Sequence, residues 1–132
     1  MLFETISELP TPFVYERLGI KYRQILIDEF QDTSLLQWKN LIPLLDNAIS
    51  STNSSILLVG DVKQSIYRWR GGYPEQFIDL TKGITPFHID PEVIRLPKNY
   101  RSQDTIVKTN NTFFKESADV LSSPDYQNLF KK

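Results

Sequence analysis

Two short apolar runs, each leading directly into acidic residues, constrain the fold of this chain more than any other feature. They are QILID (24–28), which continues into Glu29, and SILLVGD (55–61). Each run is continuous rather than alternating, which is typical of parallel strands covered by helices on both faces. A third run, EVIRLP (92–97), has similar strand character. The pattern therefore predicts several buried parallel strands.

The segment between the first two runs has the periodicity of an amphipathic helix from Leu35 to Ile49. The apolar residues that share its predicted inner face are Trp38, Leu41, Ile42, Leu45, Ala48 and Ile49. Its N-cap is expected to be one of three neighbouring residues, Asp32, Thr33 or Ser34. Pro43 lies inside the segment and predicts a kink or a late break of the helix.

Two further helices are predicted, one over 74–80 and one over about 103–121 with Ser102 as its cap. Strands that alternate with helices in this order indicate an α/β unit built on a parallel sheet. We therefore expect an α/β fold.

Ligands of open α/β sheets bind beyond the carboxyl ends of the strands, and the acidic residues lie there. Asp28 and Glu29 end the first run and Asp61 ends the second. An apolar strand that ends in Asp-Glu is the Walker B arrangement: one carboxylate suits Mg²⁺, which prefers oxygen ligands, and the other suits a water that attacks a phosphate. Asp28 fits the first role and Glu29 the second. The same pair also fits a solvated strand end or a helix N-terminus, where acids are favoured.

Three blocks of sequence resemble conserved motifs of the superfamily 1A DNA helicases, the group that contains UvrD, Rep, PcrA, RecB and AddA. LIDEFQDTS, within about 24–34, resembles motif II; VGDVKQSIYRWRGG (59–72) resembles motif III; LPKNYRS (96–102) resembles motif IV. With PFVYERLGIKYRQ (12–24) included, the resemblance is closer to the RecB/AddA branch. It implies a partial RecA-like parallel sheet flanked by helices, an incomplete domain that spans residues 1–132.

The resemblance also implies ATP and Mg²⁺ as cofactors and a role for each polar residue of motifs II and III. Asp28 would bind Mg²⁺, and Glu29 would be the catalytic base for ATP hydrolysis. Gln31 would sense the nucleotide and relay its state toward the DNA site. Gln64 would reach the γ-phosphate, since an amide can donate to a phosphate oxygen and accept from a water.

In motif IV the resemblance implies that Arg101 contacts the γ-phosphate and that Tyr100 stacks on the adenine. The guanidinium of Arg101 is a planar, permanently charged fork that suits phosphate. Without the resemblance, Arg101 could be an ordinary charge near a helix start, and Tyr100 could pack in the core.

The block SIYRWRGG (65–72) interleaves aromatic and basic residues. Single-stranded nucleic acids are bound by rings that stack on bases and by cations that contact phosphates. The resemblance implies that Tyr67, Trp69 and Arg70 contact DNA. A half-buried strand, with Tyr67 and Trp69 on one face and Arg68 and Arg70 on the other, fits the same spacing.

Composition sets further limits. Fifteen basic and sixteen acidic residues give a net charge of −1, so any surface that attracts nucleic acid is local. The absence of cysteine excludes disulfides and thiolate metal sites. The absence of an apolar run of about 18 residues predicts no membrane insertion, and we expect a cytoplasmic protein.

The sequence lacks a GxxxxGK[ST] loop, whose amides and lysine hold the phosphates of a nucleotide. We therefore expect this chain to be an internal part of a longer ATP-dependent DNA helicase of repair or recombination, inactive by itself, with an unpaired sheet edge and an uncovered apolar face. The expected partners are single-stranded or partly duplex DNA and, in the RecB/AddA branch, a second helicase or nuclease subunit. Two alternatives are a non-catalytic module that binds single-stranded DNA weakly and a P-loop ATPase unrelated to DNA.

Overall fold

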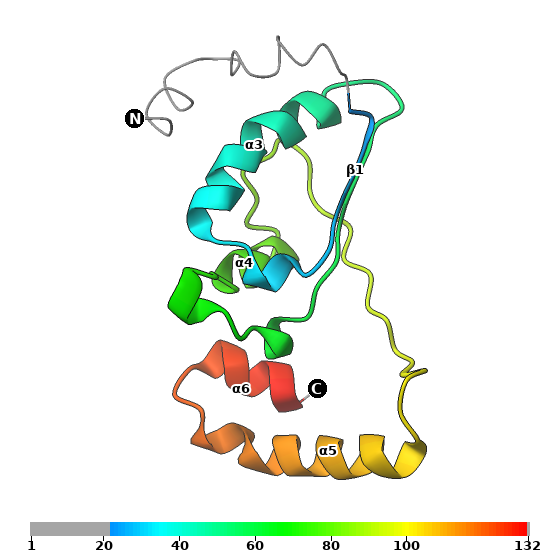
Figure 1. Cartoon of the computed structure of the whole chain (residues 1–132), viewed down its shortest axis with the longest axis vertical. Helices are drawn as coiled ribbons and strands as arrows, with labels where there is room; N and C mark the ends of the chain where they lie inside the picture. The colour runs from blue at the N-terminus through cyan, green and yellow to red at the C-terminus, as the bar shows by residue number, and fades with distance from the viewer. Residues whose placement is uncertain (1–21, 132) are drawn as a thin grey trace. The chain divides into compact units, whose positions relative to one another are not determined.

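The structure is a computed structural model that describes residues 22–131 (Figure 1). The chain is divided into two compact units, the first ending at Glu92 and the second beginning at Val93. The stretch 12–21, part of the resemblance to the RecB/AddA branch, lies outside the described residues. The elements of the first unit are β1 (Gln24–Ile27), η1 (Phe30–Asp32), α3 (Leu35–Ile49), β2 (Ser55–Leu58), η2 (Val62–Gln64), η3 (Arg68–Arg70) and α4 (Glu75–Thr81). Those of the second unit are α5 (Asp104–Ser117), η4 (Ala118–Val120) and α6 (Pro124–Lys131). The η elements are short 3₁₀ helices.

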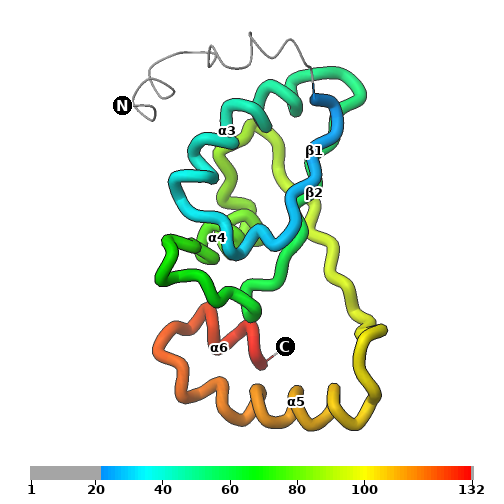
Figure 2. Tube along the Cα trace, viewed as in Figure 1, coloured from blue at the N-terminus to red at the C-terminus, as the bar shows by residue number. Residues whose placement is uncertain are grey.

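β1 and β2 pair in parallel, as the two apolar runs predict. Gln24 lies opposite Ser55, and the register continues to Ile27 opposite Leu58. The traces of the two strands run side by side in Figure 2, and α3 is the connection between them. Strand, helix and parallel strand therefore form the βαβ unit that the sequence predicts.

Only one face of this two-stranded sheet is packed within the described residues, whereas continuous apolar runs are typical of strands covered on both faces. Ile25 and Ile27 pack against the core, whereas Leu26 is 69% exposed and Leu57 is 53% exposed. α3 contacts both strands and covers the packed face. The expected uncovered apolar face is present.

α3 has the bounds and the inner face that the sequence predicts. Ser34 is its N-cap: the Ser34 Oγ accepts from the Gln37 N–H (3.2 Å), and the Gln37 Oε1 accepts from the Ser34 N–H (2.9 Å). This capping box satisfies two backbone donors at the start of the helix. The helix runs through Pro43 without interruption and ends at Ile49, so the predicted break does not occur.

The core of the first unit forms around Phe30, which is fully buried. The Phe30 ring makes edge contacts with the rings of Trp38 (centroids 4.9 Å apart) and Phe77 (5.4 Å). Leu45 and Leu80 complete the buried cluster. Phe30 follows Glu29 directly, so its burial fixes the position of the acidic segment after β1.

The predicted strand over 92–97 is wrong, because these residues form no strand. A strand needs a partner for its backbone groups, and no described residue pairs with this run. Ile94 is 71% exposed and Leu96 is 85% exposed.

The second unit consists of α5, η4 and α6. α5 begins at Asp104 after Gln103, so the predicted cap at Ser102 is wrong, and the helix gives way to η4 before Leu121. α6 was not predicted, and its Phe130 ring stacks on that of Phe114 in α5 (5.5 Å). No helix in the described part of the chain is long and apolar enough to cross a membrane.

Candidate functional site

The carboxyl ends of β1 and β2 bring three acidic residues to one edge of the sheet. Asp28 and Glu29 follow β1, and Asp61 follows β2. Pairing continues past the strands, because the Phe30 N–H donates to the Val59 carbonyl (3.0 Å). The edge where the sequence places a ligand therefore carries carboxylates from both strands.

Glu29 has a left-handed backbone conformation, with φ 51° and ψ 40°. A residue with a side chain pays about 1–2 kcal/mol for this conformation, so its neighbours must hold it there. The Glu29 N–H donates to the Asp28 Oδ1 (2.9 Å), and the Glu29 carbonyl accepts from the Asp32 N–H (3.0 Å). The bend turns Phe30 into the core and leaves the Glu29 side chain exposed.

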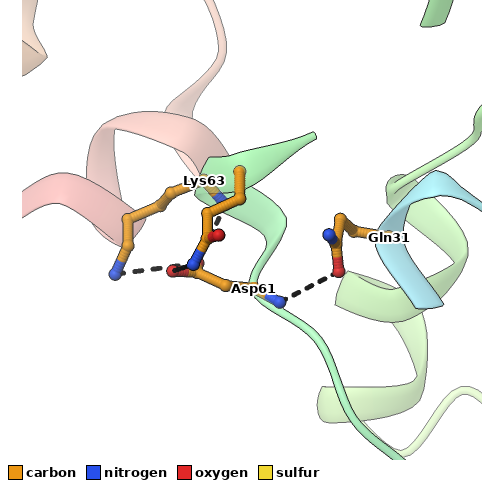
Figure 3. Close-up of polar contacts among 4 residues, drawn as sticks. Gln31, Asp61 and Lys63 are labelled. Carbon is orange, nitrogen blue, oxygen red and sulfur yellow. Dashed lines mark hydrogen bonds and ion pairs between the residues drawn. The ribbon is translucent and has the colours of Figure 1, made fainter. Parts of the chain in front are cut away.

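Gln31 points into the protein rather than out from the strand end, with only 1% of its surface exposed. Its Nε2 donates to the Glu29 Oε2 (2.7 Å), and its Oε1 accepts from the Asp61 N–H (3.0 Å). Figure 3 shows the amide of Gln31 turned toward Asp61. A buried amide with both ends bonded has one preferred orientation, because each lost bond would leave a buried polar atom unsatisfied.

Asp61 extends this line of hydrogen bonds to the residues that follow β2. Its Oδ1 accepts from the Lys63 N–H (3.0 Å), and its Oδ2 accepts from the Gln64 Nε2 (3.1 Å). The Lys63 ammonium lies 3.8 Å from the Asp61 Oδ1. Figure 3 marks this ion pair with a dashed line. Glu29 is thus joined through Gln31 and Asp61 to Gln64, which is exposed.

Because Gly60 has no side chain, the Gln31 amide can lie close to its backbone. A Cβ on Gly60 would lie 2.4 Å from the Gln31 Oε1, 3.0 Å from the Phe77 Cε1 and 3.2 Å from the Phe30 N. Sequence reasoning did not single out this residue. A glycine directly after an apolar strand is the available signal, since it often marks a close approach of another group.

The residues at this edge fit a Mg²⁺ ion that a nucleotide brings with it. The described residues contain no group of three or more His, Cys, Asp or Glu side chains that could hold a metal by themselves. Asp28 is exposed and supplies one carboxylate, and Mg²⁺ bound with a nucleotide usually takes one or two carboxylates, phosphate oxygens and waters. An open hollow of about 450 Å³ adjoins the acidic segment, lined by Glu29, Asp32, Thr33, Gln37 and Leu41.

The aromatic and basic residues after η2 form a turn of 3₁₀ helix, so the alternative of a half-buried strand is wrong. None of the residues of η3 is buried, and Trp69 is 78% exposed. The turn closes because Gly71 takes a φ of 89°, which favours glycine.

Three of the four side chains in this turn form one exposed cluster, made of Tyr67, Trp69 and Arg70. The rings of Tyr67 and Trp69 lie 6.4 Å apart, and the Arg70 guanidinium lies 5.3 Å from the Trp69 ring and 6.0 Å from the Tyr67 ring. Arg68 differs, because it forms an ion pair with Glu75 of α4.

Tyr100 and Arg101 belong to the second unit, and their roles stay predictions. Tyr100 is 88% exposed, so it does not pack in a core of the described residues. The Asn99 Oδ1 accepts from the N–H groups of Arg101 (2.9 Å) and Ser102 (3.0 Å), which fixes a local turn before α5.

Comparison with known proteins decides the family. Residues 1–85, more than half of the chain, match the family described as UvrD/REP helicase N-terminal domain. The chain belongs to the UvrD/Rep helicase family. The assignment to the superfamily 1A helicases, made from the sequence, is confirmed.

Relatives of this UvrD/Rep-family chain include helicases of several names. It is 40% identical over 103 residues to one subunit of an ATP-dependent helicase/nuclease of Carboxydothermus hydrogenoformans, a match that covers 78% of this chain and 8% of that protein. It is 34% identical over 110 residues to DNA helicase II of Haemophilus influenzae, covering 83% of this chain and 14% of the relative. With the ATP-dependent DNA helicase Rep of Buchnera aphidicola it is 34% identical over 140 residues, covering 98% of this chain and 20% of the relative. The chain therefore spans between 8% and 20% of the length of these three relatives.

Proposed function

We propose that this chain supplies the ATP-hydrolysing edge and a single-stranded DNA contact of an ATP-dependent DNA helicase. One observation carries the proposal: a hydrogen-bonded line runs from Glu29 through Gln31 and Asp61 to Gln64. A carboxylate held in one orientation beside an open edge is what the attack of water on a phosphate needs.

In this proposal the acidic segment after β1 performs the hydrolysis. Asp28 would hold Mg²⁺ together with the phosphates, and the bound ion would supply charge neutralisation at the phosphoryl group. Glu29 orients the attacking water and accepts its proton. Gln31 holds the Glu29 carboxylate through the 2.7 Å hydrogen bond, so the base does not rotate away from the water.

The residues after β2 report the state of the nucleotide. Gln64 is exposed and donates to Asp61, so a γ-phosphate can compete for its amide. Such an exchange would break one bond at Asp61 and alter the line that leads through Gln31 to the base. Gln31 would therefore relay the nucleotide state without touching the nucleotide, because it is buried.

The proposal extends to the motif assignments and to the second unit. The segments 24–34, 59–72 and 96–102 serve as helicase motifs II, III and IV, Arg101 contacts the γ-phosphate and Tyr100 stacks on the adenine. The identity to one subunit of a helicase/nuclease supports the AddA-like branch, and with it a partner subunit for the complete protein.

Single-stranded DNA is the proposed ligand of Tyr67, Trp69 and Arg70. Two exposed rings with a guanidinium beside them match the requirements of a base stack and a phosphate contact. The chain as a whole has a net charge of −1, so a local cluster of this kind must provide the attraction.

The substitution Glu29→Gln tests the hydrolytic role, in a helicase polypeptide that contains this segment and a phosphate-binding loop. It keeps the size of the side chain and removes the proton acceptor. We expect ATP turnover to fall by at least about 100-fold, the usual contribution of a general base, while nucleotide binding is largely retained. The matched control is Glu92→Gln, which alters an exposed carboxylate outside the site. Turnover within about tenfold of the unmodified protein, a barrier change of about 1.4 kcal/mol, would show that Glu29 is not the base.

A second candidate function is a module that binds single-stranded DNA and has no catalytic activity. The exposed cluster of Tyr67, Trp69 and Arg70 favours this function, because all three side chains lie together on one turn of this chain. We expect Trp69→Ala to weaken binding of an oligothymidine by about 5- to 150-fold, which corresponds to the 1–3 kcal/mol of one stacked base. Affinity that changes neither with salt nor with this substitution contradicts a DNA-contacting role for the cluster.

A further inference from the structure

The exposed aromatic cluster lies on a loop, Ile66–Tyr73, which we call the aromatic loop. Both ends of this loop are attached to three consecutive residues at the end of η1 and the start of α3, namely Asp32, Thr33 and Ser34. At the entry, the Ile66 N–H donates to the Asp32 Oδ1 (3.3 Å). At the exit, the Tyr73 N–H donates to the Thr33 carbonyl (3.1 Å), and Ser34 forms an antiparallel bridge with Gly72.

The exit is reinforced by a buried side chain of α4. Gln76 is 5% exposed, and its Nε2 donates to the same Thr33 carbonyl (2.9 Å). At the entry, by contrast, the loop is attached by the hydrogen bond to the Asp32 carboxylate. Asp32 is therefore the side chain whose removal frees one end of the loop and leaves the other end attached.

The aromatic loop is also closed on itself. The Tyr67 carbonyl accepts from the N–H groups of Arg70 (2.9 Å) and Gly72 (2.9 Å). Gly72 is buried at this crossing: a Cβ there would lie 3.0 Å from the Tyr67 carbonyl oxygen and 3.3 Å from the Asp32 carbonyl oxygen. The backbone that carries the cluster thus passes directly against the backbone of Asp32.

We propose that Asp32 is a positioning residue: its carboxylate holds the entry of the aromatic loop, so that Tyr67, Trp69 and Arg70 are arranged before a single strand arrives. Asp32 ends η1, which begins directly after Glu29 in its left-handed conformation. The loop is thereby attached to the same short helix as the proposed catalytic base. Movement of the Glu29 backbone carries the attachment points of the DNA-contacting loop with it.

The choice of DNA as the ligand of the loop rests on the proposed function, whereas the attachment by Asp32 does not. The bond needs an acceptor at Oδ1 and no negative charge. Asn carries an oxygen at the same place, so Asp32→Asn should keep the bond to the Ile66 N–H, whereas Asp32→Ala removes it. A role of the charge itself, such as a metal contact, would make the two substitutions equally harmful.

The experiment measures the mobility of Trp69 and the affinity for single-stranded DNA in the same samples of the full chain. The chain has two tryptophans, Trp38, which is 5% exposed, and Trp69. The fluorescence of the Trp69→Phe variant comes from Trp38 alone, so subtracting it from the fluorescence of the unmodified chain leaves the signal of Trp69. The substitution alters an exposed residue and leaves the core unchanged. Time-resolved anisotropy then reports loop motion without DNA, and titration with an oligothymidine reports affinity. Circular dichroism confirms that each variant is folded.

We expect Asp32→Ala to increase the fast loss of anisotropy of Trp69 and to weaken the oligothymidine complex by about 5- to 20-fold, because binding must then order the loop side chains. Asp32→Asn should stay within about twofold of the unmodified chain, as an equivalent acceptor requires. Gly72→Ala, which perturbs the same crossing from the other side, should resemble Asp32→Ala. Asp90→Ala, at an exposed carboxylate of the same unit, is the control and should change neither signal.

Anisotropy of Trp69 that is unchanged in Asp32→Ala overturns the proposal, and so does an Asp32→Asn variant as mobile as Asp32→Ala. If the mobility of Trp69 responds as expected but neither the unmodified chain nor any variant binds the oligothymidine, the attachment by Asp32 is supported and the proposed DNA contact fails. The two claims are thus tested separately.

Discussion

Gly60→Ala tests the arrangement of the buried amide of Gln31 most severely. The added Cβ would lie 2.4 Å from the Gln31 Oε1, whereas ordinary contact begins at 3.4 Å, so the oxygen must move by about 1 Å. That displacement breaks the 3.0 Å hydrogen bond from the Asp61 N–H. Rotation of the amide also loosens its bond to Glu29, since both bonds share one planar group.

The expected cost follows from two effects. A buried donor or acceptor that loses its hydrogen-bond partner costs about 1–3 kcal/mol. Overpacking against the Phe77 ring and the Phe30 backbone, 3.0 and 3.2 Å from the new Cβ, adds about 1–3 kcal/mol. We therefore expect Gly60→Ala to lower the free energy of unfolding by about 2–6 kcal/mol, a large share of the 5–15 kcal/mol typical of a domain.

Urea denaturation, followed by the fluorescence of buried Trp38, measures this cost. Gly83→Ala is the control: nothing lies within 4 Å of its new Cβ, but its φ of 79° should cost about 1–2 kcal/mol through backbone strain alone. The double variant with Gln31→Ala isolates the clash. Because the smaller side chain at position 31 leaves room for the Cβ, the cost of Gly60→Ala should fall by more than about 1 kcal/mol in that background.

Two results would refute the reasoning about Gly60 and Gln31. One is a cost of Gly60→Ala below about 1 kcal/mol, because a buried hydrogen bond cannot then have been lost. The other is a double variant whose cost equals the sum of the single costs within about 0.5 kcal/mol, because residues in contact do not behave independently.

Two further predictions concern the fold around the site. Ser34→Ala removes the cap of α3 and should lower the free energy of unfolding by about 1 kcal/mol in urea denaturation, whereas Ser34→Asp, which keeps a capping oxygen, should cost much less; equal costs would contradict a capping role. Leu26→Lys on the exposed sheet face should leave the free energy of unfolding within about 0.5 kcal/mol and reduce self-association in light scattering, whereas Ile27→Lys on the packed face should unfold the chain. Strong destabilisation by Leu26→Lys would show that the other face of the sheet is covered in solution.

Local patterns predicted the elements that depend on local contacts. The bounds of α3 follow from its periodicity and from the cap at Ser34, and α4 lies within one residue of the prediction over 74–80. The parallel pairing of β1 and β2 also follows, because a helix connects two apolar runs.

Features that depend on distant contacts were not predictable from the sequence. Whether Leu26 is covered depends on what packs against the second face of the sheet, and the apolar run is the same in either case. The run over 92–97 has the composition of a strand but no partner among the described residues. Gln31 looks like one more polar group at a strand end, yet the inward turn of Phe30 and the space at Gly60 bury it.

The candidate site also combines features that local sequence patterns predict with features that depend on distant contacts. The positions of Asp28 and Glu29 at the sheet edge follow from the apolar run before them. The line from Glu29 to Gln64 does not, since it joins residues 35 positions apart through one buried amide. The family resemblance predicts roles for Glu29, Gln31 and Gln64, and the structure adds the hydrogen bonds that link them through Asp61.

We propose that this segment works in an ATP-driven motor on DNA, and the native protein provides the test. An antibody raised against the 15.4 kDa chain isolates the polypeptide that contains it from the source cells, and ATP hydrolysis is measured with and without single-stranded DNA. We expect a polypeptide several times heavier than the chain, with ATP hydrolysis that single-stranded DNA stimulates. A polypeptide of 15.4 kDa alone, or a heavier one that does not hydrolyse ATP in the presence of single-stranded DNA, would contradict this proposal.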